Sequence, residues 1–125
     1  KTVAYRVLES EAQHTYHHKG KFFKMYVSTP ALFKNGWKPS FLGKNMIGQW
    51  NGLQVKLIAA SIGKPKYIGG FDMKKRQPKP MLKAVPEGAV YFFEILENQD
   101  SFQIKQPFTL SDYSQKEGFG LAYCA

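Results

Sequence analysis

The segment Pro86–Glu97, PEGAVYFFEILE, contains the clearest strand of this 125-residue chain. Pro86-Glu87-Gly88 is a turn signal, and an almost continuous apolar run from Ala89 to Leu96 follows it. A short apolar run bounded by turn residues is typical of a strand that is buried on both faces. We therefore expect this segment to lie at the centre of the fold.

Further strands are predicted on both sides of this segment. Residues 22–27, FFKMYV, are aromatic and β-branched. Residues 53–63 alternate in polarity, which predicts a half-buried strand with one apolar face, formed by Leu53, Val55, Leu57 and Ala59. Residues 65–73 form a short strand that a glycine pair interrupts as a bulge, and a last strand follows Gly120.

The segments between these strands are rich in turn residues. Residues 28–45 predict a long loop with one turn of helix, and KKRQPKP, residues 74–80, predicts an exposed basic loop. Residues 101–118 predict a loop and a short helical turn, with Ser111 or Asp112 as its N-cap. The length suits one domain, and the class is α+β, an antiparallel sheet with a few short helices on one side.

The charge of the chain is its strongest bulk signal. The net charge is +9, but residues 12–83 carry +13 and residues 84–125 carry −4. No carboxylate occurs from Ala12 to Phe71. Such a stretch predicts a polyanionic partner, with nucleic acid first, although a lysine-rich solvated surface is the alternative. Because 16 of the 18 basic residues are lysines, the composition favours contact with phosphates over reading of bases.

Candidate RNA-binding residues come from this basic region and from one aromatic residue. Trp37 lies among lysines and turn residues, so it is the best candidate to stack on an RNA base, whereas most other aromatic residues belong to the core. The basic candidates are Lys34, Lys38, Lys44, Lys64, Lys74, Lys75, Arg76 and Lys79.

Catalytic and cofactor motifs are weak. His14, His17 and His18 form the only histidine cluster, no second cluster of His, Cys or acids lies nearby, and the next 50 residues contain no carboxylate. A polar loop or tag-like surface segment is therefore predicted, and a metal site is not. The alternative is metal-free RNA cleavage, in which these histidines, Tyr16 and Lys24 would deprotonate the 2′-hydroxyl and stabilise the leaving group. After Gly118-Phe119-Gly120 too few residues remain for a dinucleotide-binding helix. The single Cys124 predicts a buried thiol in a reducing, cytoplasmic setting.

Four stretches together resemble the RAMP superfamily of CRISPR proteins, and within it the C-terminal half of the third subunit of the type III-B Cmr effector complex. These stretches are VSTPALFKNGWKP (27–39), VKLIAASIGKPKYIGGFDM (55–73), PKPMLKAVPEGAVYFFEI (78–95) and EGFGLAYCA (117–125). Their order and spacing fit this family as well. The missing initial Met agrees with a piece of a longer or processed chain.

The resemblance implies a ferredoxin-like, RRM-like domain over residues 21–125, with residues 1–20 unassigned. It implies that a glycine-rich loop, here Gly118, Phe119 and Gly120, contacts the guide RNA. It further implies a non-catalytic subunit that binds the 5′ tag of CRISPR RNA and docks the large polymerase-like subunit, with no cofactor, metal or membrane. A RAMP-type endoribonuclease that processes precursor RNA and a purely structural scaffold are the alternatives.

Overall fold

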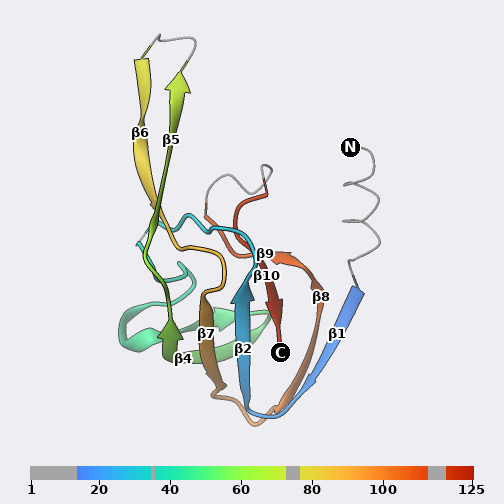
Figure 1. Ribbon diagram of the computed structural model, residues 1–125. Helices are drawn as coiled ribbons and strands as arrows, with labels where there is room; N and C mark the ends of the chain where they lie inside the picture. The colour runs from blue at the N-terminus through green and yellow to red at the C-terminus, as the bar shows by residue number, and fades with distance from the viewer. Residues whose placement is uncertain (1–13, 35, 73–76, 113–117) are drawn as a thin grey trace.

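The computed structural model describes residues 14–34, 36–72, 77–112 and 118–125, with the backbone alone for residues 69–72 and 77–82. Strands dominate this part of the chain, and the one helical element there is a 3-10 turn, η1 (Lys44–Met46) (Figure 1). The strands are β1 (His14–Lys19), β2 (Phe22–Val27), β3 (Ile47–Trp50), β4 (Leu53–Ser61), β5 (Lys66–Asp72), β6 (Gln77–Ala84), β7 (Val90–Ile95), β8 (Ser101–Gln106), β9 (Phe108–Thr109) and β10 (Leu121–Cys124).

Six of these strands form one antiparallel sheet in the order β3-β4-β7-β2-β10-β9. Strands β1 and β8 form a separate antiparallel pair, and so do β5 and β6. The β5–β6 hairpin, called the arm below, extends away from the sheet (Figure 1). The strands predicted over residues 22–27, over residues 53–63 and at the C-terminus are confirmed as β2, β4 and β10, although β4 ends at Ser61.

Backbone hydrogen bonds tie the connection between β1 and β2 to the connection between β7 and β8. Between β1 and β2, the N–H of Gly20 donates to the carbonyl of Asp100 and the carbonyl of Lys21 accepts from Ile95 N–H at 2.7 Å. The β1–β8 pair therefore folds back over the sheet (Figure 1). The Gln106 side chain in β8 accepts a hydrogen bond from the N–H of Cys124 in β10 at 2.9 Å, which fastens the two parts together.

Alternating apolar residues fill the space between the two parts. In β2 the buried residues are Phe23, Met25 and Val27, and β4 and β7 contribute Leu53, Val55, Leu57, Tyr91, Phe93 and Ile95. Phe102 of β8 packs edge-on against Phe23 and Trp50, with ring centroids 4.9 and 5.3 Å apart. Burial of this aromatic surface is the main stabilising contribution of the fold, at about 25 cal/mol per Å² of apolar area.

Two details of the predicted strands are wrong. Strand β7 is buried on one face only, because Val90, Phe92 and Glu94 alternate with the buried residues and are half-buried. Ala59 was expected on the buried face of β4, but a bulge between Leu57 and Ala59 shifts the register and leaves Ala59 exposed.

The predicted α+β, ferredoxin-like class with short helices is also wrong, since the described residues are almost entirely extended strands and loops. The polar residues expected to cap a helix join distant loops instead. The Ser111 hydroxyl accepts from Leu32 N–H at 2.8 Å and donates to the Leu32 carbonyl at 3.0 Å. The Asp112 carboxylate accepts from Lys34 N–H at 2.8 Å and from the Ser40 hydroxyl. These bonds fasten residues 111 and 112 to the loop that contains Leu32, Lys34 and Ser40.

Three segments expected to be loops are strands. The histidine segment forms β1, and residues 101–109 form β8 and β9. Pro78 and Pro80, expected in a loop, lie in β6. Within the described sheets β6 pairs with β5 alone, so a proline there interrupts no second ladder of hydrogen bonds.

Candidate nucleic-acid interface

Hydrogen bonds fix the backbone of the Gly36-Trp37 turn to the preceding loop and to the core. Gly36 has φ +80°, and its N–H donates to the carbonyl of Phe33 at 3.3 Å. The hydroxyl of the fully buried Tyr91 donates to the carbonyl of Trp37 at 2.5 Å. Burial raises the pKa of Tyr91 well above its usual range, so its hydroxyl remains a donor at physiological pH. The backbone of the turn is thus anchored while the indole of Trp37 is 43% exposed.

This indole borders a groove that three distant segments build. The connection between β4 and β5 supplies Ile62, Gly63 and Pro65, and residues 83–86, at the end of β6 and directly after it, supply the third segment. A bridge between Ala31 and Val85, with N–H to carbonyl distances of 2.9 and 2.8 Å, holds the loop that carries Trp37 against this third segment. We call this site the Trp37 groove.

The volume of the Trp37 groove is about 220 Å³. Sites for drug-sized ligands measure about 300–1,000 Å³, so this groove suits one flat ring rather than a whole nucleotide. The groove walls are mostly apolar, which is what a stacked base requires.

One lysine lines the Trp37 groove, and three more are close to its lining residues in the chain. Lys83 lines it, Lys64 lies between two lining residues, and Lys34 and Lys38 flank the turn. Among the residues that the structure describes, the only salt bridge joins Lys66 to Glu87, at 2.6 Å. Lys34, Lys38, Lys64 and Lys83 thus form no salt bridge with a described carboxylate, and unpaired lysines are typical of a phosphate-binding surface.

The structure brings some of the predicted RNA-binding residues together and separates others. Of these residues Trp37 lines the groove, and Lys34, Lys38 and Lys64 are near its lining residues in the chain. Lys44 lies in η1, which does not line the groove. Lys79 lies in β6 opposite Gly70, with only its backbone described. Lys74, Lys75 and Arg76 lie outside the described residues. Sequence reasoning missed Lys83, whose one signal was its place just before the Pro86 turn.

The predicted glycine loop lies beside the start of the segment that leads to Trp37. The Thr29 hydroxyl donates to the Gly118 carbonyl at 2.6 Å and accepts from Leu121 N–H at 2.8 Å. Gly120 is buried, and its N–H and carbonyl bond to Pro30 and Leu110 at 2.8 Å each. These bonds give Gly120 a structural role, and contact of Gly118, Phe119 and Gly120 with RNA stays a prediction.

The three histidines do not converge. Because successive residues of a strand point to opposite faces, His17 points away from the side that His18 shares with Tyr16. His18 stacks on Phe102 at 4.9 Å, accepts from the Tyr16 hydroxyl through Nδ1 at 3.0 Å and donates through Nε2 to the Phe22 carbonyl at 2.9 Å. Both of its ring nitrogens are therefore occupied.

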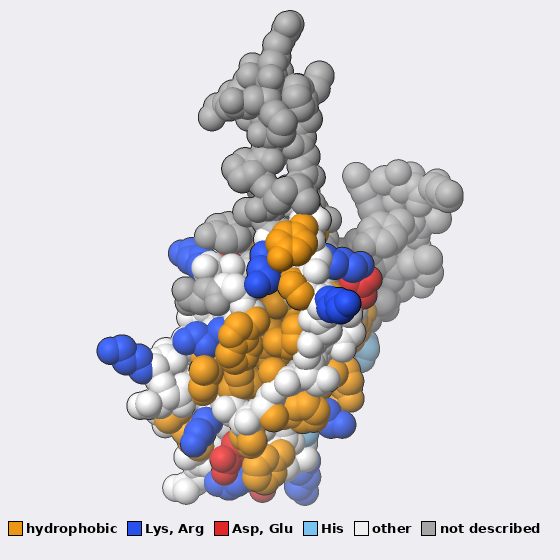
Figure 2. All heavy atoms as spheres, turned by 60° about the vertical axis from the view of Figure 1, so that its left-hand side comes forward, with side chains coloured by type: hydrophobic (Ala, Val, Ile, Leu, Met, Phe, Trp, Pro, Cys, Tyr) orange, Lys and Arg blue, Asp and Glu red, His pale blue; other side chains and the backbone are white. Residues whose placement is uncertain are grey.

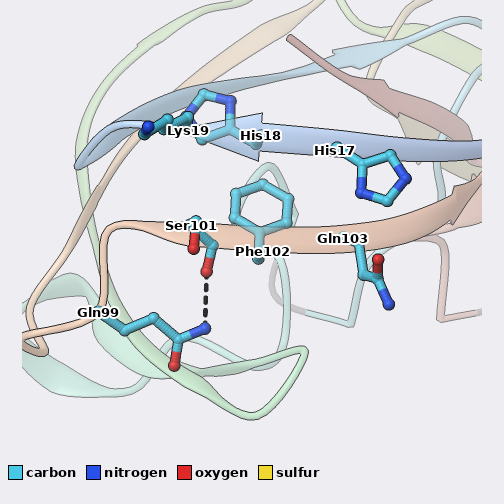
Figure 3. Close-up of a pocket in the computed structure, with 7 residues that line it drawn as sticks. All are labelled: His17, His18, Lys19, Gln99, Ser101, Phe102 and Gln103. Carbon is cyan, nitrogen blue, oxygen red and sulfur yellow. Dashed lines mark hydrogen bonds between the residues drawn. The ribbon is translucent and has the colours of Figure 1, made fainter.

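A pocket of about 500 Å³ lies at these histidines (Figure 3). Its lining residues are His17, His18, Lys19, Gln99, Ser101, Phe102 and Gln103, and none of them is a carboxylate. The Gln99 amide donates to the Ser101 carbonyl at 2.6 Å. In the described part of the chain, no group of three or more His, Cys, Asp or Glu residues could hold a metal ion.

Incubation of the protein with precursor RNA in EDTA is expected to give no cleavage, since His17 and His18 point to opposite faces of β1 and both His18 nitrogens are hydrogen-bonded. Gel analysis of end-labelled RNA measures this. His14→Ala, His17→Ala and His18→Ala are tested separately, because each of these histidines is a candidate base. Metal-independent cleavage that any of the three substitutions abolishes would favour the endoribonuclease alternative.

The thiol of Cys124 is expected to be unreactive in the folded protein. Burial raises its pKa to about 12, from an ordinary value of 9.0. A thiol-specific maleimide should therefore label the chain at pH 8 only after unfolding.

The buried Cys124 thiol also predicts a pH dependence of stability. Since the unfolded thiol ionises first, the free energy of unfolding should fall as the pH rises from 9 towards 12, by at most about 1.4 kcal/mol per pH unit for this group. Urea unfolding of wild type and Cys124→Ala across this range measures the difference, and equal slopes would contradict it.

The sequence of the chain matches a family of known proteins. The family model described as CRISPR-associated protein (Cas_Cmr3) matches residues 4–125, including most of the first 20 residues. No curated protein sequence matches the chain. Within the described residues, no helix is long and apolar enough to cross a membrane. The family match confirms the resemblance of the four sequence stretches. The chain therefore belongs to the Cmr3 family of CRISPR-associated proteins.

Proposed function

We propose that this chain is a non-catalytic RNA-binding and assembly subunit of an RNA-guided type III CRISPR complex. In this role it binds the 5′ tag region of CRISPR RNA and docks the large polymerase-like subunit. The Trp37 groove is the observation that supports RNA binding, because it combines an exposed indole on an anchored turn with lysines that no described carboxylate pairs. Membership of the Cmr3 family supports the assembly role.

Each part of the groove has a distinct task in this proposal. The lysines contact phosphates as point charges and contribute affinity without selecting a sequence. The indole stacks on one base, which contributes on the order of 1–3 kcal/mol. Anchoring of the Trp37 carbonyl by Tyr91 lowers the entropy lost on binding, since the turn needs no reordering.

Titration of a labelled single-stranded 5′-tag RNA at several salt concentrations tests the proposal. If Lys34, Lys38, Lys64 and Lys83 each neutralise one phosphate, the logarithm of the association constant should fall with that of salt with a slope of about −3. A flat salt response would contradict it. So would absence of RNA binding both for the isolated chain and for the chain assembled with the other subunits.

A scaffold whose lysines only solubilise it makes a different prediction. Charge reversal of Lys34, Lys64 and Lys83 should then leave retention of guide RNA in the assembled complex unchanged. Our proposal expects loss of the RNA with little loss of stability, because these three side chains are exposed. Reversal of Lys74, Lys75, Arg76 and Lys79 in a separate variant tests the arm in the same way.

A further inference from the structure

The molecule has a second surface that lies outside the Trp37 groove. It consists of the side chains of β2, β4 and β7 that point away from the core, and we call it the outer face. Pairing of β2 with β7 places Phe22 beside Glu94, Lys24 beside Phe92 and Tyr26 beside Val90. In β10, Tyr123 lies beside Tyr26. Aromatic and aliphatic side chains thus occupy neighbouring rows on the exposed side of the sheet.

The apolar side chains on the outer face are exposed to an unusual degree. Phe22 is 63% exposed and Ile58 is 51% exposed. The bulge in β4 adds to this surface, because it leaves the successive residues Ile58 and Ala59 both exposed. Viewed from the side of β4 and β7, hydrophobic side chains form a broad patch with lysines around it (Figure 2). Contiguous exposed apolar surface of this kind marks interaction sites.

The outer face is hollowed between two phenylalanines. A pocket of about 460 Å³ is bordered by Phe22 and Phe92, with Ile58 and Ala59 on one side and Lys24 on the other. Its walls are almost wholly carbon, so it offers few hydrogen-bonding groups to a polar ligand. Pockets of this type accept the large apolar anchor residues that dominate the affinity of protein–protein interfaces.

Charge distinguishes the occupant of this pocket from RNA. Lys24 stands 5.9 Å from the centre of the Tyr26 ring, and neither it nor Lys56 has a salt bridge to a described carboxylate. Glu94, however, lies in the same row as Phe22 and Lys56, where its carboxylate would repel a phosphate chain. The outer face therefore fits an apolar protein segment with a carboxylate that reaches Lys24.

We propose that the outer face is a protein-docking surface, which receives a large apolar side chain of another complex subunit between Phe22 and Phe92 and a carboxylate of that subunit at Lys24. The proposal rests on the assembly part of the proposed function and assigns a surface to it. It is independent of RNA binding, because no residue of the outer face lines the Trp37 groove.

Co-expression of the full chain with the remaining subunits of its Cmr complex tests the proposal. The double variant Phe22→Ser/Ile58→Ser is expected to lower the yield of chain in the purified complex by at least about 30-fold, as loss of a central apolar anchor does. Tyr67→Ser is the matched control, since Tyr67 is 61% exposed but lies on the arm, outside the pocket. Lys24→Glu should lower the yield by about 10-fold, because it sets like charges against each other.

Folding and RNA binding are measured on the same variants. The side chains of Phe22 and Ile58 are mostly exposed, so the thermal midpoint of the double variant should equal that of wild type within about 2 °C. RNA affinity of the isolated variants should also be unchanged. If the wild-type chain itself fails to join the complex, the assembly function is wrong.

If the wild-type chain joins the complex, any one of three results would overturn the docking-surface proposal without contradicting the assembly function. The first is a double variant and a Lys24→Glu variant that both join the complex as wild type does. The second is weaker RNA binding by the isolated double variant, which would make the outer face a base-stacking surface. The third is a wild-type dimer in sedimentation that the double variant abolishes without effect on the complex, which would make the occupant a second copy.

Discussion

Replacement of Gly120 by alanine is expected to lower the thermal midpoint of unfolding by about 10–15 °C. An added Cβ would lie 2.3 Å from the Cβ of Ser111 and 2.5 Å from its backbone nitrogen, closer than any real contact. Gly120 also has φ +77°, where alanine is strained. Ser111 cannot move away, because its hydroxyl holds both backbone groups of Leu32. Together these costs amount to about 3 kcal/mol or more.

Gly118→Ala is the matched control for this prediction. Gly118 has φ +90°, but its added Cβ would meet nothing within 4 Å, so only the backbone strain of about 1 kcal/mol remains. Differential scanning calorimetry of the two variants separates packing from strain. Equal midpoints would contradict the packing role of Gly120. Because Gly118→Ala should remain folded, its RNA affinity also tests whether the glycine loop contacts RNA.

Replacement of Trp37 by alanine is expected to weaken binding of single-stranded RNA by about 5- to 150-fold, the equivalent of one lost stacked base. The indole is 43% exposed and the Tyr91 bond goes to the backbone carbonyl, so the fold should be retained. The slope of affinity against salt should stay constant, because no phosphate contact is removed. Fluorescence anisotropy with 5′-tag RNA measures both quantities.

Trp37→Phe and Lys83→Glu are the controls for the stacking role. Phenylalanine keeps an aromatic ring and should restore most of the affinity lost in Trp37→Ala. Lys83→Glu should reduce the steepness of the salt dependence by about 1 while leaving the stacking contribution in place. A Trp37→Phe variant as weak as Trp37→Ala, or a Trp37→Ala variant that changes the salt slope, would show that the indole acts by another means.

The sequence predicted the strands whose own residues determine them. Residues Phe22–Val27 are mostly aromatic and β-branched, and residues Leu53–Leu57 alternate between apolar and polar, so β2 and the first half of β4 follow from the local sequence. Strand β1 does not follow from it, because HTYHHK has no apolar alternation and is extended only by its pairing with β8. The predicted fold class was wrong because contacts between distant residues decided the structure here too. Ser111 and Asp112 accept hydrogen bonds from residues about 80 positions earlier in the chain instead of capping a helix.

The candidate interface was predictable on one side only. Trp37 stood out because lysines and turn residues flank it, and the structure confirms that its ring is partly exposed. The rest of the groove lining, with Ile62, Pro65 and Lys83, is brought there by the bridge between Ala31 and Val85. No local pattern encodes a contact between residues so far apart in the chain. The pocket of the outer face was hidden likewise, because the bulge after Leu57 depends on pairing with β7.

The central place of β2 has a consequence for the order in which the molecule forms. Its neighbours are β7 and β10, with Phe23 opposite Phe93 and Tyr26 opposite Tyr123. During synthesis β2 leaves the ribosome long before either neighbour exists, so an aromatic strand waits with both hydrogen-bonding edges free. Folds that depend on such distant pairings form slowly, and until they form they expose unpaired strand edges that are prone to aggregate. Early capture by chaperones, or assembly soon after the last strand is made, would shorten that vulnerable period.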